Sequence, residues 1–134
     1  MRAINPTWWA TLTFRIEVDR VIADRTLRLW LRGIAQLTQR HFDVAWAVDL
    51  QDRGVLHHHA LLALDTLAPF DAAAGTRLWK MLHKRAGGAK IEPFDPTGGA
   101  PWYQAKHMEW DRNRACPRTG ACRRSVCVEA PGPW

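Results

Sequence analysis

The chain has 134 residues, enough for one domain with a substantial hydrophobic core. Its 19 Lys and Arg outnumber its 13 Asp and Glu, and the formal net charge of +6 favours a polyanionic partner, either nucleic acid or an anionic membrane surface. We find no run of about 18 apolar residues and no signal-peptide core, and therefore expect a cytoplasmic protein without a membrane anchor. An odd number of cysteines, three, does not form a disulfide framework and fits a reducing compartment.

Three strands and one helix are predicted for the first half of the chain. Apolar residues occupy every second position of residues 8–16, which predicts a strand with one buried face. Asp24 can cap a helix that ends near Arg40, because apolar residues recur at helical spacing behind it. Further strands are expected at residues 42–51 and 55–64, joined as a hairpin by a tight turn.

The second half of the chain contains two helical patterns and one short strand. A second helix is predicted over residues 71–85, with Gly87-Gly88 ending it. Residues 89–94 suit a fourth strand, and residues 101–110 suit a third helix that begins with proline.

This order of elements predicts an α+β fold of the ferredoxin-like, split βαβ type. Such a fold has an antiparallel sheet with helices on one face, here followed by a helix that carries the tyrosine. Trp30, Trp46 and Trp79 fall at core positions of their elements. We assign residues 1–110 to this domain. Residues 111–134 form a basic tail that holds all three cysteines and could add a strand or an arm.

A candidate metal site lies in the apolar strand that contains three consecutive histidines. Strand alternation places His57 and His59 on one face and turns His58 toward the helices. Asp49, on the neighbouring strand, could complete a set of two imidazoles and one carboxylate, and Gln51 is the competing third ligand. This donor set suits Mn²⁺ or Mg²⁺ at a phosphate. The alternative is a pair of surface histidines that bind no metal.

A candidate nucleophile lies on the predicted third helix. Tyr103 is the single tyrosine of the chain, and Lys106 follows it at i+3 on the same helix face. A phenol with a pKa of about 10 must be stabilised as phenolate by a metal or a cation before it attacks phosphorus, and Lys106 can supply that cation. The alternative is an interfacial aromatic residue beside a lysine whose stem lies along apolar surface.

Polar and aromatic residues around these groups are candidate DNA contacts. Unpaired bases stack well on exposed aromatic rings, and hydroxyl groups bind phosphate or sugar. The candidates are Thr11, Thr13, Arg53, Trp9, Trp102 and His107.

The tail adds a basic and cysteine-containing segment. Its five arginines make it a plausible phosphate-binding arm. The spacing of Cys116, Cys122 and Cys127 lacks the tight pair typical of structural zinc sites, so zinc binding by these cysteines, with His107 as a fourth ligand, stays an open alternative.

Three of these segments together resemble the motifs of the HUH endonucleases, in the order that this family has them. Thr11-Leu12-Thr13-Phe14 resembles the first-strand motif. The segment from Asp49 through Arg53-Gly54 to His57-His58-His59 resembles the acidic residue, the turn and the histidine–hydrophobe–histidine strand. Tyr103 to Lys106 resembles the Y-x-x-K motif. Two positions depart from the usual pattern: His58 replaces the central hydrophobe, and Asp49 replaces the more frequent glutamate.

The resemblance implies a single-tyrosine initiator of rolling-circle replication. Such a protein binds single-stranded DNA, often beside a hairpin, and a divalent metal polarises the scissile phosphate. Tyr103 would form a 5′-phosphotyrosine link and free a 3′-OH, and the reverse step would rejoin the DNA. No nucleotide cofactor is then needed, and a helicase and a polymerase of the host would act as partners.

Three rival interpretations stay open. A single-tyrosine transposase uses the same chemistry, although Lys106 favours the replication initiator. Two histidines and a carboxylate could instead hold iron in an oxygenase, which leaves Tyr103 and the basic charge unexplained. The third alternative is a nucleic-acid-binding module without catalytic activity.

Overall fold

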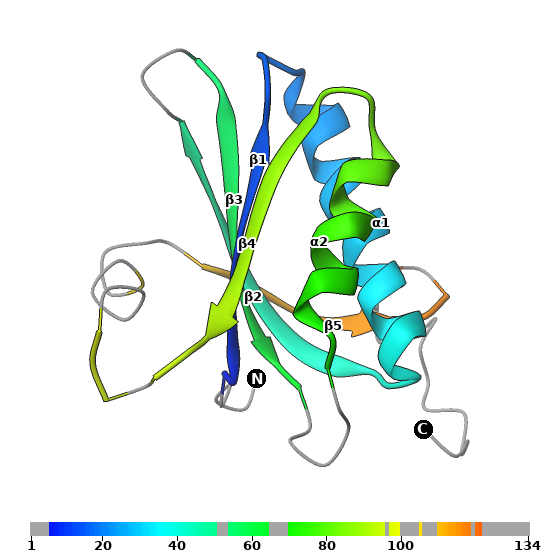
Figure 1. Cartoon of the computed structure of the whole chain (residues 1–134), viewed down its shortest axis with the longest axis vertical. Helices are drawn as coiled ribbons and strands as arrows, with labels where there is room; N and C mark the ends of the chain where they lie inside the picture. Colours follow the sequence, from blue (N-terminus) through cyan, green and yellow to red (C-terminus); the bar gives the residue numbers. More distant parts are fainter. Residues whose placement is uncertain are drawn as a thin grey trace.

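The computed structural model describes residues 6–50, 54–64, 70–95, 97–99, 105, 110–118 and 120–121. Within them the chain forms two helices and six strands, and each helix lies between two strands in the sequence (Figure 1). The elements are β1 (Trp8–Phe14), α1 (Arg20–Thr38), β2 (Phe42–Leu50), β3 (Leu56–Ala63), α2 (Ala72–Leu82), β4 (Ala86–Pro93), β5 (Asp111–Cys116) and β6 (Gly120–Ala121).

The six strands form one antiparallel sheet in the order β4-β1-β3-β2-β5-β6. Both helices lie on the same face of this sheet (Figure 1). The first four strands and the two helices make the split βαβ arrangement, so the predicted ferredoxin-like fold class is confirmed. Strand β3, which carries the three histidines, pairs with β1 on one side and β2 on the other and is therefore central.

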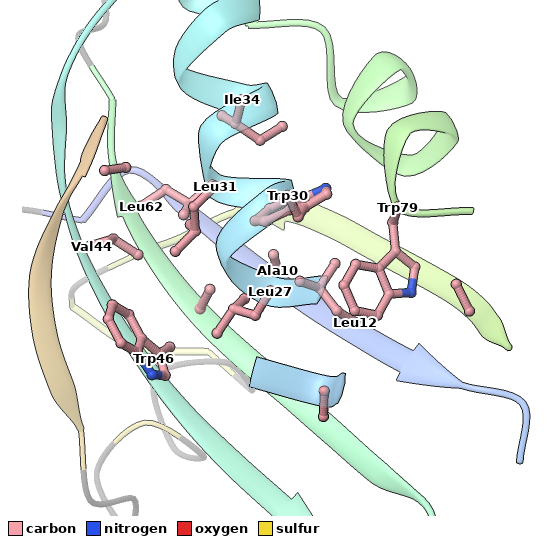
Figure 2. Packing of buried hydrophobic residues seen from close by; sticks show 14 of the residues in the cluster. Ala10, Leu12, Leu27, Trp30, Leu31, Ile34, Val44, Trp46, Leu62 and Trp79 are labelled. Atoms are coloured by element: carbon pink, nitrogen blue, oxygen red, sulfur yellow. The ribbon is translucent and has the colours of Figure 1, made fainter. Parts of the chain in front are cut away.

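The core fills the space between the sheet and α1 and α2 (Figure 2). Trp30, Trp46 and Trp79 all belong to it, as their spacing predicts. The indole nitrogen of Trp30 donates to the carbonyl oxygen of Gly75 at 2.9 Å, which ties α1 to α2. Gly75 is needed there because a Cβ atom would lie 2.7 Å from Cδ1 of Ile91. Sheet and helices are thus held in close contact on this side.

Two predicted boundaries were wrong. Helix α1 begins at Arg20, and its cap is Asp19, whose carboxylate accepts a hydrogen bond from the backbone nitrogen of Val21 at 2.7 Å. Asp24 therefore lies inside the helix and does not cap it. Helix α2 ends at Leu82, before the predicted stop at Gly87-Gly88. These two glycines lie within β4.

The segment that follows Trp110 joins the sheet. Strand β5 pairs with β2, and both Ala115 and Cys116 are fully buried. The side chains of Arg32 and Gln36 on α1 donate hydrogen bonds to the carbonyl oxygen of Pro117. Residues 111–116 are consequently part of the folded sheet. They form the added strand that was one of the two alternatives for the tail. Of the predicted third helix only Ala105, in helical conformation, and Trp110 lie within the described residues.

In the part of the chain that the structure describes, no helix is long and apolar enough to cross a lipid bilayer.

Candidate functional site

The face of the sheet opposite the helices, called the open face below, carries the predicted metal ligands. In the register of the sheet, His57 lies between Thr13 of β1 and Asp49 of β2, and His59 lies between Thr11 and Ala47. Residues directly opposite each other in antiparallel strands share a face and have neighbouring Cβ atoms. The structure therefore brings the two histidines and Asp49 to one patch of the open face, as strand alternation predicts.

His58 points to the other side of the sheet. Its side chain is fully buried in the layer of the helices, where its ring lies near those of Phe14 and Trp79. The predicted alternation of the three histidines is thus confirmed.

The two histidines of the open face differ in their surroundings. The ring of His59 is almost completely buried, and its Nδ1 atom lies 3.4 Å from Oγ1 of Thr11. The ring of His57 is more exposed, and its centroid lies 6.5 Å from that of His59, at an interplanar angle of 49°. When the Nδ1 atom of His59 carries the proton and donates it to Thr11, the Nε2 atom is left as the acceptor.

The electrostatics of the patch favour neutral imidazoles. Burial lowers the pKa of His57 and of His59 below the ordinary histidine value, and the negative charge of Asp49 opposes this effect in both. A lowered pKa keeps each ring unprotonated at neutral pH, which leaves a nitrogen lone pair available to a metal ion.

The donor set suits a divalent cation by residue type and not by the side-chain positions in the structure. Among the described residues, no three His, Cys, Asp or Glu side chains converge closely enough to hold a metal as they stand. Two imidazoles on one ion need ring centroids about 5 Å apart, given metal–nitrogen distances of about 2.1 Å, so His57 must turn toward His59. Asp49 and His57 are directly opposite each other in the register of β2 and β3, so their Cβ atoms are neighbours.

The predicted role of Trp9 in stacking on bases was wrong for the described structure. Its side chain is 1% exposed, and its ring packs against those of His59, Phe94 and Trp110. Its indole nitrogen donates to Oγ1 of Thr11 at 3.2 Å. Alternation places Trp9 on the open face, but Phe94 and Trp110 cover that part of the face. Trp9 therefore contacts both His59 and Thr11 and helps to fix the positions of their side chains.

Thr13 lies on the open face as predicted. Its hydroxyl group donates a hydrogen bond to the carbonyl oxygen of Gly88 at 2.7 Å, which links β1 to β4. The oxygen lone pairs stay available, but its single proton is already used within the sheet.

Lys90 is a further residue of the open face that the sequence did not predict. In the register of β1 and β4, Lys90 lies directly opposite Thr11, which in turn lies opposite His59. The lysine side chain is largely exposed, and its Nζ atom is 3.6 Å from Oε2 of Glu92. A cation therefore flanks the histidines on the open face. The register of β4 against β1 is the signal that would have found it, and that register cannot be read from the sequence.

Several predicted site residues lie outside the described residues. They are Gln51, Arg53, Trp102, Tyr103, Lys106, His107, Cys122 and Cys127. Ala105, the described residue nearest in sequence to Tyr103 and Lys106, packs against the cluster of Trp9, Ala45 and Leu61 on the open face. Its carbonyl oxygen accepts a hydrogen bond from the indole nitrogen of Trp110 at 2.9 Å.

Comparisons with known proteins found no family model, no curated protein and no solved structure that matches this chain.

Proposed function

We propose that this protein is a metal-dependent endonuclease that nicks and rejoins single-stranded DNA through a tyrosine nucleophile, as an initiator of rolling-circle replication. The observation that carries the proposal is the placement of Asp49, His57 and His59 on the face of the sheet against which Ala105 packs. Ala105 stands between Tyr103 and Lys106 in the sequence, and the proposal expects these two residues to act on the face against which Ala105 packs.

In this proposal, His57, His59 and Asp49 hold Mn²⁺ or Mg²⁺. The bound cation supplies Lewis acidity that polarises a non-bridging oxygen of the scissile phosphodiester. The two imidazoles are neutral at the pH of the cytoplasm because their pKa values are lowered, so no proton has to leave before they bind. Thr11 holds the ring of His59 in place, and Trp9 packs against that ring.

Tyr103 is the nucleophile of the proposed reaction. Its phenolic oxygen forms a bond to phosphorus, the bond from phosphorus to the 3′-oxygen breaks, and the phenolic proton ends on the released 3′-OH. Lys106 stabilises the phenolate before the attack. The phosphotyrosine bond retains the energy of the broken phosphodiester, so a 3′-OH can reverse the step and no nucleotide cofactor is consumed.

The test is incubation of the protein with a randomised pool of single-stranded oligonucleotides and Mn²⁺, followed by a denaturing gel. A covalent DNA–protein adduct is expected with the unchanged chain, and none with Tyr103→Phe, which removes only the attacking oxygen. Binding of the pool by Tyr103→Phe, measured by filter retention, controls for folding. An adduct of undiminished yield from Tyr103→Phe would refute the role of Tyr103.

The same assay separates the rival interpretations. A non-catalytic module would bind the pool without an adduct at any metal concentration. A transposase would form the same adduct, and sequencing of the cleaved pool would then give the recognition site that distinguishes a replication origin from the end of a mobile element.

A further inference from the structure

A cavity of about 340 Å³ opens on the helix side of the sheet, away from the histidines. Its walls are the first half of α1, the middle of β2 and the beginning of β5. Figure 2 shows two of its lining side chains, Leu27 and Trp46, between α1 and β2. The proposed endonuclease function assigns no role to this cavity.

The lining is apolar at one side and polar at the other. Leu27, Trp46 and Val48 line it from the core, and the first two are buried. The remaining lining residues carry charges or an amide: Arg20, Asp24, Arg28, Asp111 and Asn113. Small-molecule sites are concave and place a few polar groups beside an apolar wall.

The polar groups select the kind of ligand. Arg20 and Arg28 stand two turns apart on α1, about 12 Å along the helix axis, and their long stems allow each to bind a separate phosphate. The carboxylate of Asp24, 3.7 Å from the Arg20 guanidinium, and that of Asp111 would repel a bare anion. The same carboxylates accept hydrogen bonds from exocyclic amino groups, and Asn113 can both donate and accept.

We propose that this cavity binds one unpaired nucleoside of single-stranded DNA together with its two flanking phosphates. The base lies against Trp46 and Leu27, its polar edge meets Asp24, Asp111 and Asn113, and the arginines bind the phosphates. Adenine, cytosine and guanine carry an exocyclic amino group and thymine does not, so the cavity disfavours thymidine.

The position of the cavity on β2 connects it with the metal site. Val48 lines the cavity, and the next residue, Asp49, lies on the open face. The pairing of β2 with β5 ends at Trp46 and Asp111, so among the described residues no strand covers the edge of β2 beyond Trp46. One DNA strand that crosses this edge can occupy both sites. In this respect the inference rests on the proposed function, because it takes DNA as the ligand.

The experiment titrates the full chain with the four deoxynucleoside 3′,5′-bisphosphates in the absence of divalent metal. Binding is followed by the NMR signal of the Trp46 indole, assigned with Trp46→Phe. Saturable binding is expected, weakest for the thymidine compound. Arg28→Ala should weaken it by about tenfold, because a charge-assisted phosphate contact is lost. Arg25→Ala is the matched control, since Arg25 is an exposed arginine of the same helix that does not line the cavity, and it should leave the affinity nearly unchanged.

Three results would overturn the proposal: no saturable binding of any bisphosphate, equal losses for Arg28→Ala and Arg25→Ala, or equal affinity for all four bases. The adduct assay tests the proposed nuclease activity independently of the cavity. If bisphosphates bind through Arg28 but no adduct forms with Mn²⁺, the cavity remains a nucleotide site and the nuclease is wrong. If adducts form but no bisphosphate binds, the nuclease stands without the cavity.

Discussion

The Nε2 atom of His58 lies 3.9 Å from Oδ1 of Asp24, yet neither ring nitrogen of this buried histidine has a hydrogen-bond partner in the described structure. Burial, and to a smaller extent the positive charge of Arg20, together lower the pKa of His58 to about 4. The imidazole is therefore neutral at pH 7, and the contact with Asp24 is no ion pair. The polar ring of His58 thus occupies a core position that suits an apolar side chain.

His58→Leu should stabilise the protein. Leucine has a similar volume and removes two buried, unpaired nitrogen atoms, each of which costs about 1–3 kcal/mol when it is left without a partner. We expect the free energy of unfolding, measured with urea, to rise by roughly 1–2 kcal/mol, and the Tyr103 adduct to persist. His58→Ala is the control: it removes the same nitrogens but leaves a void, and should destabilise. A Leu variant that is less stable than the parent would contradict this account.

The same substitution should flatten the dependence of stability on pH. The pKa of His58 is lower in the folded than in the unfolded chain, so as the pH falls below about 6.5 the unfolded state takes up a proton first and stability decreases until about pH 4. The loss is on the order of 3 kcal/mol. His57 and His59 act in the same direction and remain in the variant. Urea midpoints across this pH range should therefore fall more steeply for the parent than for His58→Leu, and parallel curves would show that another group dominates.

Asp49→Ala should weaken Mn²⁺ binding by at least about tenfold, because a carboxylate cancels charge on a divalent ion. Gln51→Ala should have a smaller effect, since an amide oxygen is uncharged. Calorimetric titration of both variants with Mn²⁺ makes the comparison. A greater loss for Gln51→Ala would transfer the role of third ligand to that residue. Thermal melting of the metal-free variants checks that neither change unfolds the sheet.

Lys90→Ala should weaken binding of single-stranded DNA and reduce the slope of log affinity against log salt by about 1, since one phosphate contact is removed. Lys80→Ala serves as control, because Lys80 is exposed on α2, in the layer of helices on the other side of the sheet. Filter binding of an oligonucleotide at several salt concentrations gives both slopes. Equal slopes for the two variants would mean that Lys90 acts only through net charge.

The fold class could be predicted from the sequence because alternation is visible in every strand that carries the core. In β1, β2 and β3, the residues on the buried face are apolar except for His58, and the alternation at His57, His58 and His59 follows directly. The beginning of α1 was missed because Asp19 and Asp24 are equally good caps as residue types, and only the helical pattern extended back to Ala23 selects Asp19.

Other features depend on contacts between distant segments. Trp9 is buried because Phe94 and Trp110, far along the chain, cover it, and no local pattern contains that information. Lys90 reaches the open face through the register of β4, and register is set by packing across strands. Ala115 is buried because β5 pairs with β2. The segment of β5 contains few apolar residues, so its sequence does not predict a strand of the sheet.

Truncation should distinguish the folded edge of the sheet from the segment behind it. Removal of residues 122–134 leaves β5 and β6 intact, so the shortened chain should melt cooperatively and form the Tyr103 adduct, with DNA affinity reduced by the loss of Arg123 and Arg124. Removal of residues 111–134 takes away β5 with the buried Ala115 and Cys116, uncovers the outer side of β2, and should lower stability by about 3 kcal/mol or more.

The melting curves of the two truncated chains show whether β5 and residues 122–134 are needed for the fold. If the chain that ends at Trp110 melted like the full-length protein, β5 would be dispensable and residues 1–110 would suffice for the fold. If the chain that ends at Ala121 failed to fold, residues 122–134 would be structural, and Cys122 and Cys127 would be the first residues to examine. A chelator added to the full-length protein would then separate two causes: a fall in melting temperature indicates a cysteine-bound metal, and an unchanged curve indicates packing alone.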